Sequence, residues 1–339
     1  MDGSSCSATV LLYRENTMSK NVIVTGANGF VGSAVVKELL CNHYNVYAVV
    51  HNGCRNRLSN DSGLMCISGD MRNTEEWIKE LPQQEYACIY HFAWAGSAGP
   101  SRADVGLQLQ NVLWTSHLLR AAEKIGCKRI VAAGSIMEHE TLESIYGEDK
   151  ILGAGNIYGG GKVAAHIMNM VEAARLGISL IWGSITNAYG PGEISPRLIN
   201  TSIQKCLRGI SPQFTSGTQN YDFVYIDDVA RAFRLIGERG KAYEEYLIGS
   251  SQAKPLKQFL LEMQQAIAPD VPFLFGSVPF RGMNLPLTAF DCSKTKQDTG
   301  FRATVGFTEG CKRTAAWWRN RLNQQLKCGR RRKTNEPEI

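Results

Sequence analysis

The chain has 339 residues, of which 44% are hydrophobic and 20% are charged, and its formal net charge is +6. This length is enough to bury a core without metal or disulfide staples, and the composition is that of a globular protein rather than a disordered one. Half of the charge belongs to the last 13 residues, where five lysines and arginines against two glutamates give +3. The body is therefore close to neutral, which argues against a nucleic-acid partner.

Ten cysteines are spread singly along the chain, with no Cys-x-x-Cys pair and no histidine beside them at metal-ligand spacing. This distribution of cysteines predicts free thiols in a reducing compartment and no metal site. The first 19 residues lack the pattern of a signal peptide, and the chain has no apolar stretch long enough to span a membrane. We therefore expect a cytoplasmic protein without a membrane partner, in which Met18 could be the functional start.

A glycine motif stands near the start of the chain: residues 22–32 read Val-Ile-Val-Thr-Gly-Ala-Asn-Gly-Phe-Val-Gly, and an amphipathic run continues to residue 40. This pattern predicts a strand, a tight turn and a helix. Gly26 permits the turn, Gly29 lets a pyrophosphate approach the backbone, and Gly32 lets the helix lie close to the strand. The free N–H groups at the start of the helix would then face the phosphates of a dinucleotide. The alternative interpretation is a glycine-rich turn without a ligand.

After this motif, predicted strands over residues 45–50, 65–68, 86–92 and 129–133 alternate with predicted helices, among them a long one over 102–125. Such alternation is typical of an α/β fold with a doubly wound parallel sheet, which binds its ligand at the carboxyl ends of the strands. The residues at or just past those ends, which should surround one crevice, are Thr25, His51, Asp70, Ala93 and Ser135.

The end of the second predicted strand indicates which dinucleotide the crevice takes. An NAD site usually offers a carboxylate there. This chain instead offers four polar residues without a carboxylate, namely His51, Asn52, Arg55 and Arg57. Two arginines without an acid suit the 2′-phosphate of NADP, so we expect NADP, with NAD possible; a solvated basic loop is the alternative. Asp70 could accept a hydrogen bond from the adenine amino group or cap a helix over residues 74–81.

Tyr158 and Lys162 are four residues apart at the start of a predicted helix over 158–176, which places their side chains on one face. A nearby ammonium lowers the pKa of a tyrosine, which is otherwise a poor proton donor or acceptor at neutral pH. Ser135 could give a second hydrogen bond to the same substrate oxygen. Three glycines between Tyr158 and Lys162 each cost about 1 kcal/mol in a helix relative to alanine. We therefore expect cofactor or substrate to approach the helix closely there.

Five motifs together resemble the extended short-chain dehydrogenase/reductases, the NAD(P)-dependent epimerase/dehydratase group that acts on nucleotide sugars. The motifs are residues 25–32, Ser135, residues 158–162, residues 187–192 and residues 221–228. The resemblance covers about residues 20–322. It implies a Rossmann domain over 20–182 that also receives 220–250, a smaller α/β nucleotide-sugar-binding lobe over 183–322, an N-terminal extension over 1–19 and a basic tail over 323–339. It also implies a homodimer formed through the helices over 102–125 and 158–176.

The resemblance assigns roles to individual residues. It implies Ser135, Tyr158 and Lys162 as the catalytic set. The implied cofactor-binding residues are Thr25, Gly26, Asn28, Gly29, Phe30, Val31, Gly32, His51, Asn52, Arg55, Arg57, Asp70, Met71, Phe92, Ala93, Trp94, Asn111, Tyr158 and Lys162. The implied substrate-binding residues are Ser135, Asn187, Arg197, Tyr221 and Arg281. Tyr221 stands where the family commonly has a phosphate-binding arginine, which leaves the nucleotide base open.

Two clusters of charged residues have alternative interpretations. Glu138, His139 and Glu140 follow Ser135 closely and could touch a sugar, form a helix cap or lie in a solvated turn. Asp227 and Asp228 could form a carboxylate dyad, but their place before a predicted helix over residues 229–236 favours a cap.

Departures from the family pattern narrow the expected activity. The dehydratases of the family place an Asp-Glu pair directly after the catalytic hydroxyl residue, where this chain has Ile136 and Met137, so 4,6-dehydration is not expected. The smaller lobe resembles that of the 4-ketoreductases that make CDP-abequose. The first hypothesis is a 4-ketoreductase of a nucleotide-linked 4-keto-6-deoxyhexose. The second is a 4-epimerase with retained NAD, and the third is a cofactor-binding regulatory subunit without catalysis.

Overall fold

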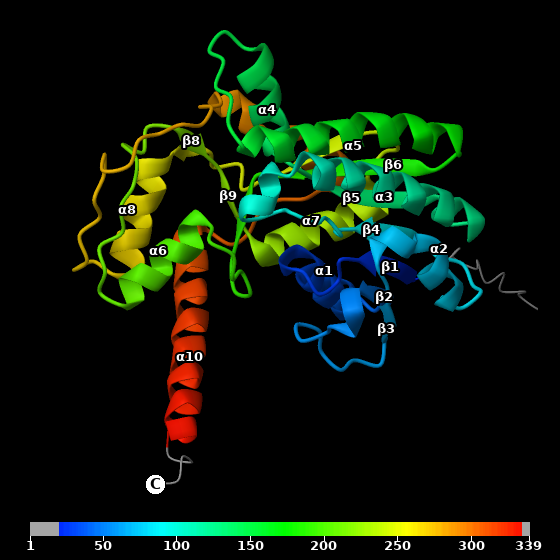
Figure 1. The fold of residues 1–339 in the computed structure, drawn as a ribbon, viewed down its shortest axis with the longest axis horizontal. Coiled ribbons are helices and arrows are strands. Elements are labelled where there is room, and N and C mark those ends of the chain that lie inside the picture. Colours follow the sequence, from blue (N-terminus) through cyan, green and yellow to red (C-terminus); the bar gives the residue numbers. More distant parts are fainter. Residues whose placement is uncertain (1–19, 334–339) are drawn as a thin grey trace, which may run out of the picture.

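The computed structural model of the chain describes residues 20–333, with side chains as far as residue 324. The expected N-terminal extension over 1–19 lies outside the described residues, as do residues 334–339. Seven parallel strands form the central sheet, in the order β10-β6-β5-β4-β1-β2-β3 (Figure 1). Their bounds are β1 (Asn21–Thr25), β2 (Asn45–Val50), β3 (Leu64–Ser68), β4 (Cys88–His91), β5 (Arg129–Ser135), β6 (Ser179–Ile185) and β10 (Glu245–Ile248). The order reverses between β1 and β4, so the predicted doubly wound α/β sheet is confirmed.

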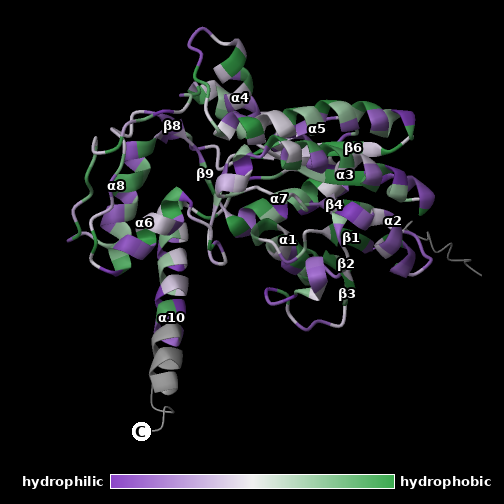
Figure 2. Cartoon of the chain, viewed as in Figure 1, coloured by the Kyte–Doolittle hydropathy of each residue, from purple (hydrophilic) through white to green (hydrophobic). Residues whose placement is uncertain are grey.

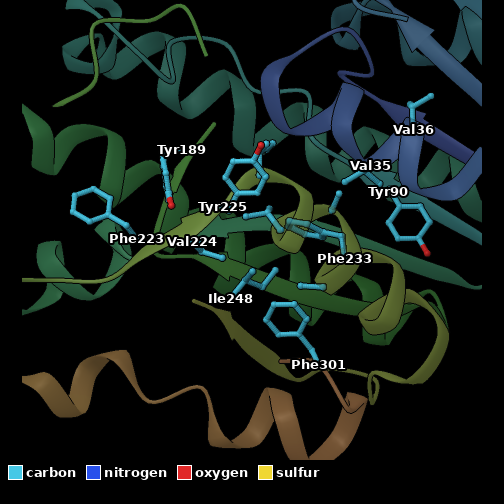
Figure 3. Close-up of a cluster of buried hydrophobic side chains, with 14 of the residues drawn as sticks. Val35, Val36, Tyr90, Tyr189, Phe223, Val224, Tyr225, Phe233, Ile248 and Phe301 are labelled. Carbon is cyan, nitrogen blue, oxygen red and sulfur yellow. The ribbon is translucent and has the colours of Figure 1, made fainter. Parts of the chain in front are cut away.

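Helices cover both faces of the sheet, because successive side chains of a strand point to opposite faces. Val22 and Val24 of β1 belong to one hydrophobic cluster, and Ile23 between them belongs to another. The helices on the first face are α1 (Phe30–Cys41) and α7 (Ile226–Arg239), and those on the second face are α2 (Thr74–Trp77), α3 (Val105–Lys124) and α5 (Gly155–Arg175). Figure 3 shows the first cluster, in which Val36 of α1 and Phe233 of α7 point toward the sheet.

The smaller lobe lies beside the carboxyl ends of the strands (Figure 1). Its elements are β7 (Asn187–Tyr189), α6 (Leu198–Leu207), β8 (Asn220–Tyr221), β9 (Phe223–Tyr225), β11 (Lys254–Pro255), α8 (Leu256–Ile267) and α10 (Phe307–Lys333). Two other helices pack on the sheet domain: α4 (Met137–Tyr146) lies against α5, and α9 (Ser293–Thr299) lies against α7 and β10. Short 3₁₀ helices lie at His51–Gly53, Met71–Asn73, Ile78–Glu80, Pro100–Ala103 and Leu287–Phe290. The rings of Phe223, Phe259 and Phe307 join β9, α8 and α10, with centroids 4.9 to 5.3 Å apart.

The chain returns from the smaller lobe to the sheet. β10 pairs with β6, and α7 packs against α1. Both α7 and β10 follow β7, α6, β8 and β9 of the smaller lobe in the chain. They belong to the segment over residues 220–250 that the sequence places with the Rossmann domain. The domain limits themselves stay a prediction.

The acidic pair at the head of α7 does not cap it. α7 begins at Ile226, so Asp227 and Asp228 lie inside its first turn. The buried Asp228 carboxylate accepts hydrogen bonds from the backbone N–H groups of Thr304 at 3.0 Å and Val305 at 2.9 Å, and it pairs with Arg231. Asp228 therefore fastens the segment before α10 to the sheet-covering helix, and the expected cap is wrong for this residue.

The C-terminal helix α10 projects from the body (Figures 1 and 2) and extends to Lys333, so the first part of the expected tail over 323–339 is helical. Within the described part of the chain, no helix combines the length and apolar composition that crossing a membrane requires. Over the same residues, no cluster of three or more His, Cys, Asp or Glu side chains could hold a metal ion.

Candidate active site

A cleft of about 1490 Å³ opens at the carboxyl ends of β1 to β5. It gathers most of the residues predicted to bind a cofactor. These are Gly26, Asn28, Gly29, Phe30, Val31, Gly32, His51, Arg57, Asp70, Met71, Phe92, Ala93, Trp94, Asn111, Tyr158 and Lys162. The crevice predicted from the strand ends is thus a single large cleft.

The glycine turn at the end of β1 is shaped for close backbone contacts. Gly26 has a φ of +65°, and a Cβ there would lie 2.6 Å from the backbone nitrogen of Ala93. A Cβ at Gly32 would lie 2.2 Å from the Gly26 carbonyl oxygen, so only glycine lets α1 start this close to the strand. Gly29 is the N-cap of α1 and provides no side-chain cap. The first N–H groups of α1 are therefore free to bind an anion.

Three residues predicted to bind the cofactor lie away from the cleft. The side chain of Thr25 is fully buried beneath it, with Oγ1 2.7 Å from Nδ1 of His91. Asn52, with a φ of +51°, and Arg55 are exposed in the segment after β2 and do not line the cavity. The Thr25 side chain is therefore hydrogen-bonded to β4 rather than open to the cleft.

The far end of the cleft, at β2 and β3, carries the charges that would meet an adenosine ribose. Asp70 receives hydrogen bonds from Arg72 at 2.7 Å and pairs with His51 at 3.1 Å. Arg72 holds the pKa of Asp70 down, to about 2. Arg57 donates a hydrogen bond to the Gly192 carbonyl across the mouth of the cleft. Asp70 also accepts from the backbone N–H of Arg72 at 2.9 Å, so it caps a 3₁₀ turn while lining the cleft.

The predicted catalytic residues meet in the middle of the cleft. Ser135 is the last residue of β5 rather than the residue after it. α5 begins at Gly155, so Tyr158 lies at the end of its first turn and Lys162 lies one turn further on. The ammonium of Lys162 donates to the Ala133 carbonyl at 2.8 Å and lies 3.5 Å from the centroid of the Trp94 ring. Burial lowers the pKa of Lys162 to about 7. Burial raises the pKa of Tyr158, against nearby guanidinium groups and the Ser135 hydroxyl, which lower it.

Two of the three glycines between Tyr158 and Lys162 have a different cause from the one expected. A Cβ at Gly159 would lie 1.9 Å from Oγ1 of Thr141, and one at Gly161 would lie 2.9 Å from Cβ of Gln108. These contacts belong to α4 and α3. A Cβ at Gly160 would meet open space among the described residues. Two of the glycines therefore let neighbouring helices pack closely on α5, and the expectation that cofactor or substrate approaches there is wrong for them.

A smaller cavity of about 280 Å³ adjoins the cleft and shares Ser135 and Arg197 with it. Asn187 and Tyr221, two further residues predicted to bind substrate, line this cavity. Asn187 donates to the Asp222 carbonyl at 3.2 Å, and burial raises the pKa of Tyr221 to about 12. Arg281 is exposed and lies outside both cavities, so the structure does not bring it to the other predicted substrate residues.

Three charged residues of the smaller cavity are outside the predicted binding set, namely Arg102, Glu140 and Glu193. Arg102, from the 3₁₀ turn after β4, lies with its guanidinium carbon 4.7 Å from the centroid of the Tyr158 ring. Glu140 of α4 faces the same cavity, and burial raises its pKa to about 7. Arg102 could have been suspected from its place after a strand end, since such segments surround the crevice. Glu140 was one of three candidates in its cluster, of which Glu138 is buried behind the cleft and His139 pairs with Glu245.

The fold and the cleft define an α/β dinucleotide-binding protein of the Rossmann type, with a serine, a tyrosine and a lysine at the centre of the cleft. The NAD dependent epimerase/dehydratase family matches residues 22–249, and the chain belongs to this family. The family resemblance drawn from the motifs is thereby confirmed.

Two curated relatives match most of this chain. A trifunctional UDP-glucose 4,6-dehydratase/UDP-4-keto-6-deoxy-D-glucose 3,5-epimerase/UDP-4-keto-L-rhamnose-reductase of Arabidopsis thaliana is 24% identical over 88% of this chain. This chain spans 47% of that relative, about half its length. A dTDP-glucose 4,6-dehydratase of Streptomyces griseus is 24% identical over 89% of this chain and 94% of its own.

Solved structures of similar proteins show the same fold. MoeE5, in complex with UDP-glucuronic acid and NAD, is 28% identical with a TM-score of 0.73, over 89% of this chain and 99% of its own. UDP-glucose 4-epimerase of Thermotoga maritima, with UDP-glucose, is 24% identical with a TM-score of 0.74, over 89% of this chain and 99% of its own.

Proposed function

We propose that the protein is an NADP-dependent 4-ketoreductase that acts on a nucleotide-linked 4-keto-6-deoxyhexose. The observation that carries this proposal is the meeting of Ser135, Tyr158 and Lys162 where the large cleft joins the smaller cavity. A dinucleotide fits the large cleft, and a sugar nucleotide would enter from the smaller one. The activities of the relatives named above, a UDP-glucose and a dTDP-glucose 4,6-dehydratase, support this class of substrate.

The side chains divide the work between proton transfer and orientation. Bound in the large cleft, NADPH would supply the hydride to the carbonyl carbon. The Tyr158 hydroxyl gives its proton to the carbonyl oxygen as that oxygen becomes an alcohol, and the Ser135 hydroxyl holds the same oxygen. Lys162 would hold the nicotinamide ribose, and its positive charge favours the tyrosinate that remains after proton transfer. Trp94 forms the wall beside them.

The carboxylates near the sugar position argue against dehydration, although relatives carry that activity. Loss of water needs an acid and a base on the sugar. Ile136, which directly follows Ser135, is buried against Leu285 and Phe290. Among the described carboxylates of the smaller cavity, Glu193 is held by Arg197 and Ser195, which leaves Glu140 without a second acid.

The proposed preference for NADP rests on the charges at the adenosine end. Arg57 and Arg72 both line the cleft there, and Asp70 forms an ion pair with Arg72 and a hydrogen bond with His51. An arginine fork is the natural partner of a phosphate. The opposing interpretation is that Asp70 accepts the ribose hydroxyls of NAD, the cofactor named with MoeE5.

A nucleotide-sugar 4-epimerase with retained NAD is the second candidate, favoured by the epimerase among the similar structures. Mass spectrometry of the gently denatured protein separates the two, because an epimerase recycles its cofactor and retains NAD, whereas a ketoreductase is isolated empty. Oxidation of NADPH on addition of 4-keto-6-deoxy sugar nucleotides then tests the reductase directly. Retained NAD together with interconversion of 4-epimers would replace the first proposal by the second.

Substitution of the tyrosine tests whether the protein is an enzyme at all. Tyr158→Phe should lower kcat by a factor on the order of 10² or more, because the proton donor is lost while the ring remains. The dissociation constant of NADPH, measured by fluorescence, should stay within about twofold. Unchanged turnover would remove Tyr158 from the mechanism, and a wild type inactive on every nucleotide sugar would favour a regulatory subunit.

We also propose a homodimer formed through α3 and α5, which pack side by side. Leu109 and Leu113 of α3 and Met168 and Val171 of α5 are between 50 and 62% exposed, and each pair shares one face of its helix. Figure 2 shows hydrophobic residues among hydrophilic ones along both helices. Light scattering after gel filtration should give a dimer for the wild type and a monomer for the Leu109→Glu, Met168→Glu variant. Tyr146→Glu, an exposed change on α4, is the control, and a monomeric wild type would contradict the proposal.

A further inference from the structure

A buried carboxylate lies behind the catalytic residues. Glu138, near the start of α4, is 3% exposed and lines neither cavity. Its Oε1 accepts hydrogen bonds from the backbone N–H of Ser135 at 2.9 Å and from Nε1 of Trp182 at 3.0 Å. Its Oε2 lies 3.1 Å from Nδ1 of His166. A carboxylate with both oxygens engaged by protein groups is held in one place.

One of these bonds fixes the end of β5. β4 pairs with β5 only as far as His91 opposite Ala132, so the strand edge beside Ser135 has no neighbour in β4. The Ser135 N–H would be left without a strand partner, which is costly in a buried place. Glu138 provides the missing acceptor, and the Ser135 hydroxyl in turn accepts from the backbone N–H of Met137 at 3.2 Å. The position of the Ser135 side chain in the cleft therefore depends on Glu138.

The same cluster reaches the ammonium of Lys162. Trp182, which donates to Glu138, has its ring centroid 6.0 Å from Nζ of Lys162, and the ring of His166 stacks on Trp182 at 4.7 Å. In the described part of the chain Lys162 has no ion-pair partner, although it is only 5% exposed. An ammonium taken out of water needs compensation. The Glu138 charge opposes the effect of burial and raises the pKa of Lys162.

We propose that Glu138 is a positioning residue of the active site, whose carboxylate fixes the backbone of Ser135 and supplies the counter-charge of the Lys162 ammonium. The inference rests on the proposed function in one respect, namely that Ser135 and Lys162 act on the substrate. Glu138 itself touches neither substrate nor cofactor. It acts by holding the backbone at the end of β5 and through the electrostatic effect of its charge on Lys162.

Other titratable and charged groups surround this pair, so the contribution of Glu138 must be isolated. They are His91 of β4, Arg102 of the turn after β4, His139 of α4, Tyr158 and His166 of α5, Arg197 before α6, and Glu245 of β10. Glu138→Gln removes the charge but keeps an oxygen that can accept from Ser135 and Trp182. His166→Gln is the matched control, because it changes the same cluster to an amide while leaving the Glu138 charge in place.

The test is a pH titration of the lysine side chains by ¹³C NMR on the full chain without ligands, with Lys162→Met to assign the Lys162 signal. The Lys162 midpoint should fall by on the order of one pH unit in Glu138→Gln, since an opposite charge nearby is worth that much or more. It should not fall in His166→Gln. An unchanged midpoint in folded Glu138→Gln would overturn the proposal.

A variant with a shorter carboxylate separates the two roles of Glu138. It also provides a second test if Glu138→Gln does not fold. Glu138→Asp keeps the charge but draws it back from Ser135, so the Lys162 midpoint should stay while kcat falls more than KM changes. A fall of the Lys162 midpoint in a folded Glu138→Asp variant would contradict the charge role, and unchanged kcat would contradict the positioning role. The titrations use no substrate, so a failure of the proposed reaction, seen as an inactive wild type, is distinct from a failure of this inference.

Discussion

The buried ammonium of Lys162 lowers the stability of the folded protein. Burial lowers its pKa from 10.5 to about 7, a difference of between three and four units, which corresponds to roughly 5 kcal/mol at 1.36 kcal/mol per unit. The unfolded chain binds this proton more tightly than the folded one. The penalty on stability is therefore complete below pH 7 and disappears as the pH rises toward 10.5.

Lys162→Met should accordingly stabilise the free protein while abolishing its activity. Methionine fills the space without a charge, but it leaves the Ala133 carbonyl without its donor, at a cost of about 1–3 kcal/mol. The net gain at pH 6.5 should be roughly 2–4 kcal/mol in the free energy of unfolding. Above pH 7 the lysine of the folded protein is neutral, so the gain should shrink as the pH rises toward 10.5. It should change sign between about pH 8 and 10, where the remaining penalty falls below the cost of the carbonyl left without a donor.

Urea unfolding followed by circular dichroism at pH 6.5, 8 and 9.5 measures this difference. Lys124→Met is the matched control, since Lys124 is 60% exposed and pairs only with Glu75, so its loss should change stability by less than about 1 kcal/mol at each pH. A Lys162→Met variant less stable than the wild type at pH 6.5, or a gap that does not vary with pH, would refute the reasoning.

Two further predictions concern the helix packing and the cofactor. Gly159→Ala should destabilise the protein by about 1–3 kcal/mol, because its methyl group would meet Thr141 of α4, whereas Gly160→Ala, which meets open space, should stabilise α5 by up to about 1 kcal/mol. Thermal unfolding compares the two, and equal effects would show that the contact with α4 relaxes freely. Arg72→Ala should weaken NADPH at least tenfold more than NADH in fluorescence titrations, with Arg55→Ala as a control outside the cleft; equal losses for the two cofactors would indicate NAD.

The parts of the site that the sequence predicts are those coded by local spacing. The glycines of the β1 turn and the pair Tyr158 and Lys162 act within a few residues of one another, so strand and helix periodicity places them correctly. Ser135 follows from the rule that ligands meet the carboxyl ends of parallel strands. These local spacings predict the positions correctly because tertiary packing does not change which residues share a turn or a helix face.

The remaining features depend on which elements meet, and spacing does not contain that information. Arg102 and Glu140 come from a turn and a helix that converge only in the folded chain. The glycines of α5 indicate a close approach but not the approaching group, which for Gly159 is α4 rather than a ligand. Arg281 lies in an irregular segment without periodicity, so no pattern indicates where its side chain points.

The return of the chain to the sheet has a consequence for synthesis. β6 ends at Ile185 and its partner β10 begins at Glu245, so β6 stays an open edge until the ribosome has released the intervening residues. At about 5–20 residues per second this delay lasts several seconds, and α7, which covers α1, is missing for much of that time. A nascent chain stalled in this interval would expose both a strand edge and the apolar face of the sheet, which are the surfaces that chaperones bind and that aggregates grow from.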